Sequence, residues 1–340
     1  PAGFLYGKDP LAGAVNLVRK QPLPGNFFAF NGSFGSFDTV ESTVDWNASG
    51  TDGTLNFRLN GLWRESDGYR DRMDSSEIAI NPSLTWNLGP ESSLNFNLEF
   101  VDAEHSPDNG LPLLDNTIPA VSRKTSYQSA EDFSEQQINR FQLDYETKVS
   151  DRLTIRNKTY YRELDWQTDG TLLRGTFDSE DGAVWLLPGQ VQVVRDLARL
   201  DDRQRFVGNQ FETILTFDGG KVEHKLLAGL EIVRESDEFT FDLQPLVDVE
   251  LYAAAPTPLM LLFDQGAPAL SSAGDVTNLV IAPYIADQMK LSPRFELLLG
   301  ARYDFIDSDG DITPLGAGPT SFSRDDSELS PMAGLVFAPD

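Results

Sequence analysis

A chain of 340 residues can hold two ordinary domains or one large barrel, and its mixture of 24% charged and 11% aromatic residues favours strands with one wet face. The net charge of −26 excludes a nucleic-acid binder, because a polyanion would be repelled over most of the surface. The sequence has no cysteine, which argues against a disulfide framework, a thiolate metal site or a thiol nucleophile.

Residues 1–24 differ in texture from the rest of the chain. They are rich in glycine and other small residues, and they end in one compact apolar strand followed by a basic pair and a proline. The first six residues lack the charged and then hydrophobic pattern of a signal peptide, so we expect the functional protein to begin before this chain does.

From Asn26 onward the chain repeats one unit of about ten residues with a period of two. Leu55, Phe57 and Leu59 alternate with polar residues, so one face suits hydrocarbon and the other suits water. No stretch offers the roughly 20 uninterrupted apolar residues of a membrane-spanning helix. We expect about twelve strands, at residues 26–36, 39–49, 54–66, 76–88, 93–104, 136–149, 152–166, 204–217, 221–235, 276–290, 294–307 and 328–338.

The connections between these strands alternate in length. Short connections rich in Gly, Asp, Ser or Pro predict hairpin turns. They lie at residues 50–53, 89–92, 150–151, 218–220 and 291–293. Long connections lie at residues 67–75, 105–135, 167–203, 236–275 and 308–327. This sorting places the long loops on one side of the sheet, which is extracellular in bacterial barrels, whereas a sandwich mixes loop lengths at both ends.

Tryptophans mark both edges of the predicted wall. Trp46 and Trp86 precede short turns, and Trp63 lies near a long connection, so the three fit two aromatic girdles, with ordinary core packing as the alternative. Residues 153–166 change the parity of their apolar positions around two adjacent tyrosines. This change predicts a bulge or a rim segment, and we assign no faces there.

The string of residues 1–24 resembles the last stretch of the plug domain of TonB-dependent outer-membrane receptors. In that family the stretch runs from a Tyr-Gly through a Gly-Gly and an apolar, Asn-containing strand to a basic Lys-Pro end. Ala12 replaces the first Gly of the Gly-Gly pair. The matching residues are Gly7, Gly13, Asn16, Val18, Lys20 and Pro22. Barrel landmarks of the family are resembled, in order, by residues 224–231, 284–288, 300–304 and 330–337.

This resemblance implies an all-β fold, a 22-stranded antiparallel transmembrane β-barrel with a plug inside it, in the outer membrane of a Gram-negative bacterium. Residues 1–24 would be the C-terminal end of the plug, and residues 25–340 a partial barrel with long extracellular loops. We expect a monomer in contact with outer-membrane lipid, no resident cofactor, and a TonB complex that contacts a segment outside this chain. An open edge is unstable in lipid, so this piece alone should not insert.

No arrangement of residues predicts an enzyme. A Ser-His-Asp triad would need His105 or His224, and both lie at strand edges or beside turns. Asp307, Asp309 and Asp311 resemble half of a calcium loop, but the bidentate Glu that such a loop needs is absent. We therefore interpret these aspartates as part of a solvated loop.

The resemblance implies that cargo contacts come from the plug apex, the inner wall and the outer loops. Tyr6 is the best single candidate, because an aromatic residue at this place faces the ligand in some relatives; packing within the plug is its alternative. Inward-facing arginines would offer charge to an anionic ferric chelate, or else would pair with Asp and Glu across the plug boundary. These arginines are Arg58, Arg64, Arg156 and Arg162.

We therefore expect a receptor that binds a ferric siderophore outside the cell and passes it to the periplasm with energy from TonB. Cobalamin, a saccharide or another metal chelate is the alternative cargo. A passive porin would keep the strands but would lack a plug, against which residues 1–24 argue. A soluble β-protein would have to pack the apolar stripes against a second sheet.

Overall fold

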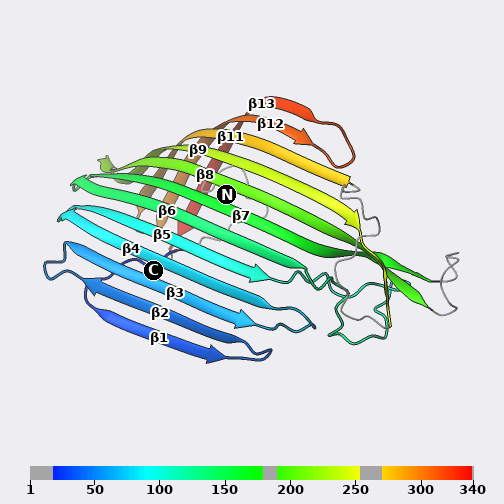
Figure 1. Ribbon diagram of the computed structural model, residues 1–340. Coiled ribbons are helices and arrows are strands. Elements are labelled where there is room, and N and C mark those ends of the chain that lie inside the picture. Colours follow the sequence, from blue (N-terminus) through cyan, green and yellow to red (C-terminus); the bar gives the residue numbers. More distant parts are fainter. Residues whose placement is uncertain (1–17, 179–189, 253–269, 339–340) are drawn as a thin grey trace.

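The computed structural model describes residues 18–178, 190–252 and 270–338. These residues form one antiparallel sheet of 13 strands (Figure 1). In this part of the chain no helix is long and apolar enough to cross a membrane. The strands are β1 (Phe27–Phe34), β2 (Val40–Ser49), β3 (Leu55–Ser66), β4 (Ser75–Gly89), β5 (Ser92–His105), β6 (Phe133–Ser150), β7 (Leu153–Asp178), β8 (Val191–Gly219), β9 (Val222–Pro245), β10 (Val249–Glu250), β11 (Leu270–Ser292), β12 (Phe295–Thr313) and β13 (Thr320–Phe337).

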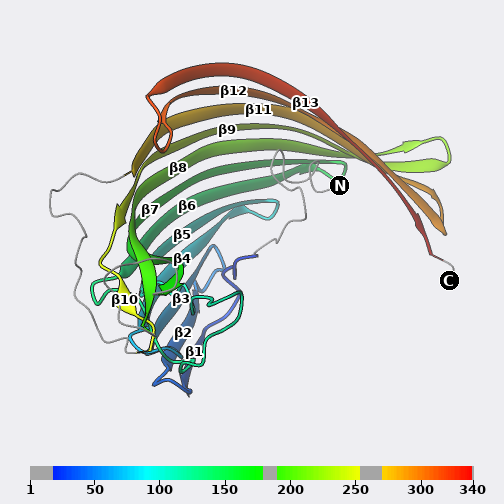
Figure 2. The same cartoon turned by 90° about the vertical axis from the view of Figure 1, so that its right-hand side faces the viewer.

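Twelve strands follow one another in chain order, each paired with its neighbours, and β10 adds to β8 through two residue pairs. Among the described strands, β1 and β13 have one neighbour each, so the sheet is an open arch (Figure 2). Each of the twelve predicted strands is present, and the predicted fold class, an all-β antiparallel barrel wall, is confirmed. The short strand β10 was not predicted.

Several strands are longer than predicted on the side of the long connections. β7 has 26 residues and β8 has 29, whereas a transmembrane strand needs about 9–11. The prediction of loops at residues 167–203, 236–275 and 308–327 is therefore wrong in part, because much of these ranges is strand. Beyond the lipid both faces of a strand meet water, so the backbone ladder continues after the side-chain alternation has ended.

The two faces of the sheet have opposite chemistry. Leu84 lies directly opposite Phe57 on one neighbouring strand and Phe96 on the other, and residues opposed in this way share a face. The alternate positions carry buried polar side chains on the concave face. They include Asn47, Asn56, Arg58, Ser83 and Asn97. A soluble protein shows the reverse pattern, so the convex face suits lipid and the concave face suits a polar lumen.

The three tryptophans share the apolar, convex face. Trp46 is 44% exposed, Trp86 43% and Trp63 38%. Trp86 lies opposite Leu55 close to the short turns, and Trp63 lies opposite Ile78 toward the long connections. Large exposed aromatic side chains at both edges of the apolar band favour aromatic girdles over ordinary core packing.

The predicted irregularity in residues 153–166 is wrong. The register between β7 and β8 is continuous from Leu153 to Leu173, and it shifts only between Leu173 and Gly175. The parity of apolar residues changes because Tyr160 and Trp166 belong to the concave face, where Trp166 Nε1 donates to Ser134 Oγ at 2.9 Å. Large amphipathic rings on the lumen face thus produce the same sequence pattern as a bulge would.

Candidate functional site

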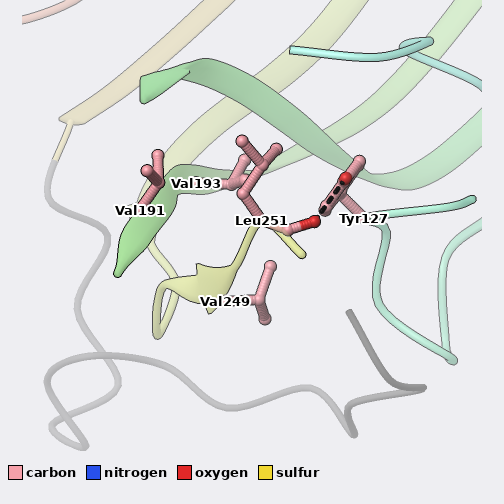
Figure 3. Packing of buried hydrophobic residues seen from close by; sticks show 5 residues of the cluster. All are labelled: Tyr127, Val191, Val193, Val249 and Leu251. Carbon is pink, nitrogen blue, oxygen red and sulfur yellow. Dashed lines mark hydrogen bonds between the residues drawn. The ribbon is translucent and has the colours of Figure 1, made fainter. Parts of the chain in front are cut away.

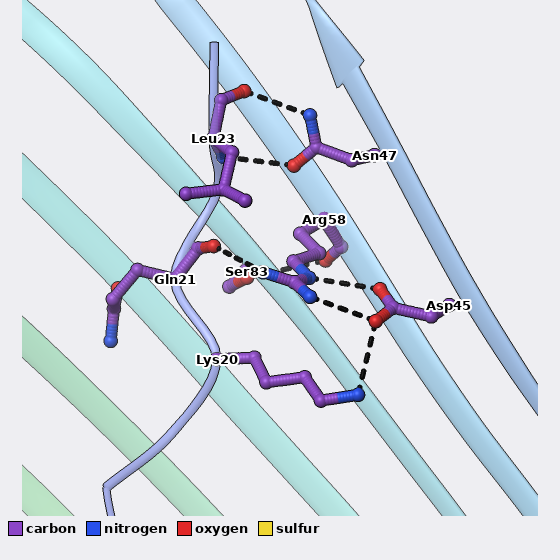
Figure 4. Close-up of polar contacts among 7 residues, drawn as sticks. All are labelled: Lys20, Gln21, Leu23, Asp45, Asn47, Arg58 and Ser83. Atoms are coloured by element: carbon purple, nitrogen blue, oxygen red, sulfur yellow. Dashed lines mark hydrogen bonds and ion pairs between the residues drawn. The ribbon is translucent and has the colours of Figure 1, made fainter. Parts of the chain in front are cut away.

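Residues 18–25 run along the concave face of the sheet before the chain enters β1 (Figure 4). The segment forms neither helix nor strand, so its backbone polar groups depend on partners from the wall. Those partners lie on β2 and β3, and the side chain of Arg19 reaches β5 and β6. The wall therefore binds this segment through polar groups of four strands.

Asn47 on β2 holds the end of the segment. Its side chain is fully buried, and its Nδ2 donates to the carbonyl oxygens of Leu23 at 2.8 Å and Gly25 at 2.6 Å. Its Oδ1 accepts the backbone N–H of Leu23 at 2.9 Å. A single planar amide thus satisfies one donor and two acceptors, as a neighbouring strand would.

Arg58 on β3 joins the wall to the segment. Its Nε and Nη2 each donate to the carboxylate of Asp45 at 2.8 Å, and its Nη1 donates to the carbonyl of Gln21 at 2.9 Å. Lys20 Nζ lies 3.0 Å from the same carboxylate. Bidentate guanidinium–carboxylate pairs are among the strongest polar contacts in proteins, so Arg58 is engaged at the boundary between segment and wall.

A second ionic group surrounds Glu99 on β5. Arg140 Nη1 lies 3.0 Å and Arg19 Nη2 lies 3.4 Å from its carboxylate oxygens. Arg162, directly opposite Arg140, stacks over Phe206 with its Cζ 5.5 Å from the ring centroid, and its buried Nε has no acceptor among the described residues. A cavity of about 800 Å³ lies beside this group. Two guanidinium groups here share one carboxylate, and that of Arg162 lies beside them.

The other two predicted arginines lie at opposite ends of the concave face. Arg64 sits on β3 between two glutamates of the neighbouring strands, is exposed, and makes no ion pair within the described part of the chain. Arg156 lies near the short turns and pairs with Glu146 at 2.7 Å. All four arginines face inward, but they do not converge on one pocket. Tyr6 lies outside the described residues.

An acidic pocket of about 610 Å³ opens where residues 106–132 meet the outer ends of β3, β4, β5 and β6. Arg72 and His105 are the basic residues that line it. The acidic lining residues are Glu65, Asp67, Asp74, Glu104, Glu131 and Asp132. The mouth of the lumen is therefore negative, in contrast to the group around Glu99 deeper inside.

Three segments far apart in sequence pack into one apolar cluster at the outer end of the wall (Figure 3). Tyr127 comes from the long connection after β5, Val191 and Val193 from the start of β8, and Val249 and Leu251 from β10 and the residue after it. Tyr127 Oη donates to the carbonyl of Leu251 at 2.7 Å. The cluster ties these outer segments together.

Arg195 on β8 fixes the polar side of this cluster. It is almost fully buried, and it donates to the carbonyls of Tyr127 at 2.8 Å and Val247 at 2.7 Å. Burial lowers the pKa of Arg195 and raises the pKa of the nearby Asp132. Sequence reasoning placed Arg195 in a loop and missed it. The signal that could have found it is the alternation of Val191, Val193 and Arg195.

Asp202, which is buried, and Asp237, which is half-buried, form an acidic pair on the concave face. Asp202 is 6% exposed, and its Oδ2 accepts from Gln204 Nε2 at 2.9 Å. Burial, followed by the neighbouring Asp237 carboxylate, raises the pKa of Asp202 to about 6. The short turn lies at Gly219, and β8 needs about 9–11 residues from there to cross the lipid. Asp202 lies farther along the strand than that, so the pair is outside the membrane-spanning part.

The structure also places the two histidines and the three aspartates that the sequence singles out. His224 Nδ1 lies 2.7 Å from the carboxylate of Asp287, and His105 lines the acidic pocket. Residues 307–311 belong to β12, so their interpretation as a loop is wrong. In the described ranges, no group of three or more His, Cys, Asp or Glu residues is arranged to hold a metal ion.

Comparison with known proteins places this geometry in a family. The family model described as TonB dependent receptor-like, beta-barrel, matches residues 80–340. The metal-pseudopaline receptor CntO of Pseudomonas aeruginosa is 25% identical over 350 residues, which cover 99% of this chain and 47% of that protein. The catecholate siderophore receptor Fiu of Escherichia coli K12 is 24% identical over 326 residues, covering 89% and 41%.

Solved structures show the same fold. The siderophore receptor PiuA from Acinetobacter baumannii superposes with a TM-score of 0.83 at 18% identity, over 100% of this chain and 51% of that one. The open form of Fiu from E. coli K12 gives a TM-score of 0.81 at 21% identity. The chain spans about half the length of the curated relatives that it matches.

We predict that Asn47→Asp in the full-length protein loosens residues 20–26. The substitution replaces two buried N–H donors by an acceptor that faces two carbonyls, and each unsatisfied buried group costs about 1–3 kcal/mol. Amide exchange in this segment should rise, while Asn31→Asp, on the exposed part of the same face, should leave it unchanged. Equal exchange in both variants would contradict the role of Asn47.

Arg195→Met should free the outer segments from one another. Methionine keeps much of the apolar stem but leaves the carbonyls of Tyr127 and Val247 without their buried donor. We expect limited proteolysis within residues 106–132 to become at least about tenfold faster. The matched control is Arg199→Met, because Arg199 is half-exposed and pairs with Asp169. The role assigned to Arg195 is wrong if the two variants are cut equally fast.

The acidic pair should make the outer end of β8 and β9 pH-dependent. Because the pKa of Asp202 is raised from 3.8 to about 6, its contribution to stability is fully present below pH 3.8 and is lost as the pH rises through about 6. Intrinsically corrected amide exchange around residues 198–206 should therefore be faster at about pH 7 than at about pH 5. Asp202→Asn should remove this difference, and Asp201→Asn should retain it.

Proposed function

Since the chain belongs to the TonB-dependent receptors of the Gram-negative outer membrane, we propose that it is part of a receptor that imports a ferric siderophore with energy from TonB. Residues 1–24 are then the end of the plug, and residues 25–340 the first part of the barrel. The mechanism is binding and gated passage without bond chemistry, so the protein is not an enzyme.

The observation that carries this proposal is the segment of residues 18–25 fixed inside the lumen. The buried side chains of Asn47 and Arg58 donate hydrogen bonds to its backbone carbonyls. A passive porin leaves its channel open to water, whereas a chain segment anchored to the inner wall is what a plugged receptor requires. The anchoring polar groups therefore favour gated uptake over free diffusion.

The siderophore as cargo is supported by the relatives and by the charge of the lumen. Fiu is named a catecholate siderophore receptor and CntO a metal-pseudopaline receptor. The cationic group formed by Arg19, Arg140 and Arg162 exceeds the charge of Glu99, which suits an anionic chelate. The name of CntO also favours a second candidate cargo, a metal chelate other than a ferric siderophore.

The four arginines are not equivalent as cargo contacts. Arg64 is exposed near the mouth, whereas Arg58 and Arg156 are paired with carboxylates and Arg162 lies deeper, over Phe206. We therefore place the first contact with cargo at Arg64, with Tyr6 on the plug as a further candidate. TonB would act through a segment outside this chain, and the receptor would work as a monomer.

Uptake of radiolabelled iron by cells that express the full-length receptor tests the proposal. Ferric catecholate, hydroxamate and aminocarboxylate chelates should be tried, and at least one should enter only when TonB is present. Arg64→Gln should weaken binding of that chelate about tenfold, the value of one charged contact of about 1.4 kcal/mol, while Arg156→Gln should not. Entry that does not need TonB would support a porin, and entry of cobalamin or a saccharide alone would replace the cargo.

A further inference from the structure

Two tyrosines on the lumen wall reach across a neighbouring strand in opposite directions. Tyr160 starts on β7, crosses β8 and donates its hydroxyl to Glu231 on β9 at 3.1 Å. Tyr284 starts on β11, crosses β9 and donates to Glu212 on β8 at 2.8 Å. Each ring thus links two strands that are not neighbours in the sheet.

Each tyrosine crosses its neighbouring strand at a glycine. Gly208 on β8 is directly opposite Tyr160, and Gly229 on β9 is directly opposite Tyr284. A Cβ atom added to Gly208 would lie 2.5 Å from Tyr160 Oη, and one added to Gly229 would lie 2.5 Å from Tyr284 Oη. Real Cβ atoms essentially never approach other heavy atoms within 3.0 Å, so a side chain at either position would require the ring to move.

The two crossings interlock with charged and polar neighbours. Gln210 Nε2 donates to Tyr284 Oη at 2.7 Å, and Arg302 of β12 lies 2.9 Å from Glu231. The Cζ of Arg302 is also 5.8 Å from the centre of the Tyr284 ring. Side-chain contacts therefore connect five consecutive strands, from β7 to β12 on the main path of the sheet, in addition to the backbone ladder.

We propose that Tyr160 and Tyr284 are reciprocal staples across this sector of the wall, and that Gly208 and Gly229 let both rings lie flat so that the lumen keeps its width. The staples tie each strand to its second neighbour. The glycines leave the space that each ring occupies above the strand, because any side chain there pushes the ring toward the lumen interior. This inference concerns the wall itself and goes beyond the proposed uptake of a chelate.

The test uses the full-length receptor in detergent and follows its heat-dependent shift in gel mobility. Gly208→Ala and Gly229→Ala should each lower the folded-to-unfolded ratio at the wild-type midpoint about tenfold or more, because overpacking displaces a ring. Gly334→Ala is the matched control, since its Cβ would lie on the same concave face with its nearest neighbour, Leu298 Cβ, at 3.9 Å. Equal midpoints for all three variants would overturn the proposal.

A double-mutant cycle separates the staple from a general intolerance of alanine. In a Tyr160→Ala background the ring is absent, so adding Gly208→Ala should have no further destabilising effect. If Gly208→Ala alone does not fold, the double variant Tyr160→Ala/Gly208→Ala should fold again. Additive losses, or failure of the double variant to recover, would show that the glycine does not serve the tyrosine.

The hydroxyl contact is tested separately. Tyr160→Phe keeps the ring over Gly208 but removes the hydrogen bond to Glu231, so it should lower the midpoint less than Tyr160→Ala does. A Tyr160→Phe variant as unstable as Tyr160→Ala would assign the effect to the hydrogen bond alone and would overturn the role of the flat ring.

Discussion

Backbone pairing is the constraint on which the rest of this structure depends. In hydrocarbon, every N–H and C=O group must find its partner within the protein, so a wall made of strands has to be a continuous antiparallel ladder. That ladder gives each strand one face toward lipid and one toward the lumen. The chemistry inverts accordingly, with Leu84 and Phe57 outside and a fully buried Asn47 inside.

The polar inner face creates the second requirement, because buried amides and guanidinium groups need partners. Residues 18–25 supply them along β2 and β3, where Asn47 and Arg58 bind backbone carbonyls. Farther around the arch, the wall satisfies itself through Tyr160, Tyr284 and Arg302. One side of the lumen thus holds a chain segment, and the other is linked by its own side chains.

The sequence predicts well wherever lipid enforces alternation and poorly where it does not. The membrane-spanning part of β3 can be predicted because Leu55, Phe57 and Leu59 must face hydrocarbon. The outer halves of β7, β8 and β9 cannot be predicted in this way, because water on both faces removes the alternation of apolar and polar residues. No faces could be assigned around Tyr160, because a large ring on the lumen face interrupts the alternation of apolar and polar residues.

The candidate site was predictable only in part, for a related reason. Side-chain parity places Arg58 and Arg64 inside, but pairing is a property of neighbouring strands, so the engagement of Arg58 by Asp45 could not be predicted. Arg195 was hidden because its partners, the carbonyls of Tyr127 and Val247, lie far away in sequence. Resemblance to a family predicts that residues 1–24 are the end of a plug, which periodicity alone could not do.

The central claim is that residues 18–25 lie inside the lumen against β2, β3, β5 and β6. Photo-crosslinking tests it most directly, with a benzophenone amino acid in place of Gln21 in the full-length receptor in outer membranes. Mass spectrometry should find the crosslinks within residues 40–150. Crosslinks to lipid, or to strands β9 to β13 alone, would contradict the account.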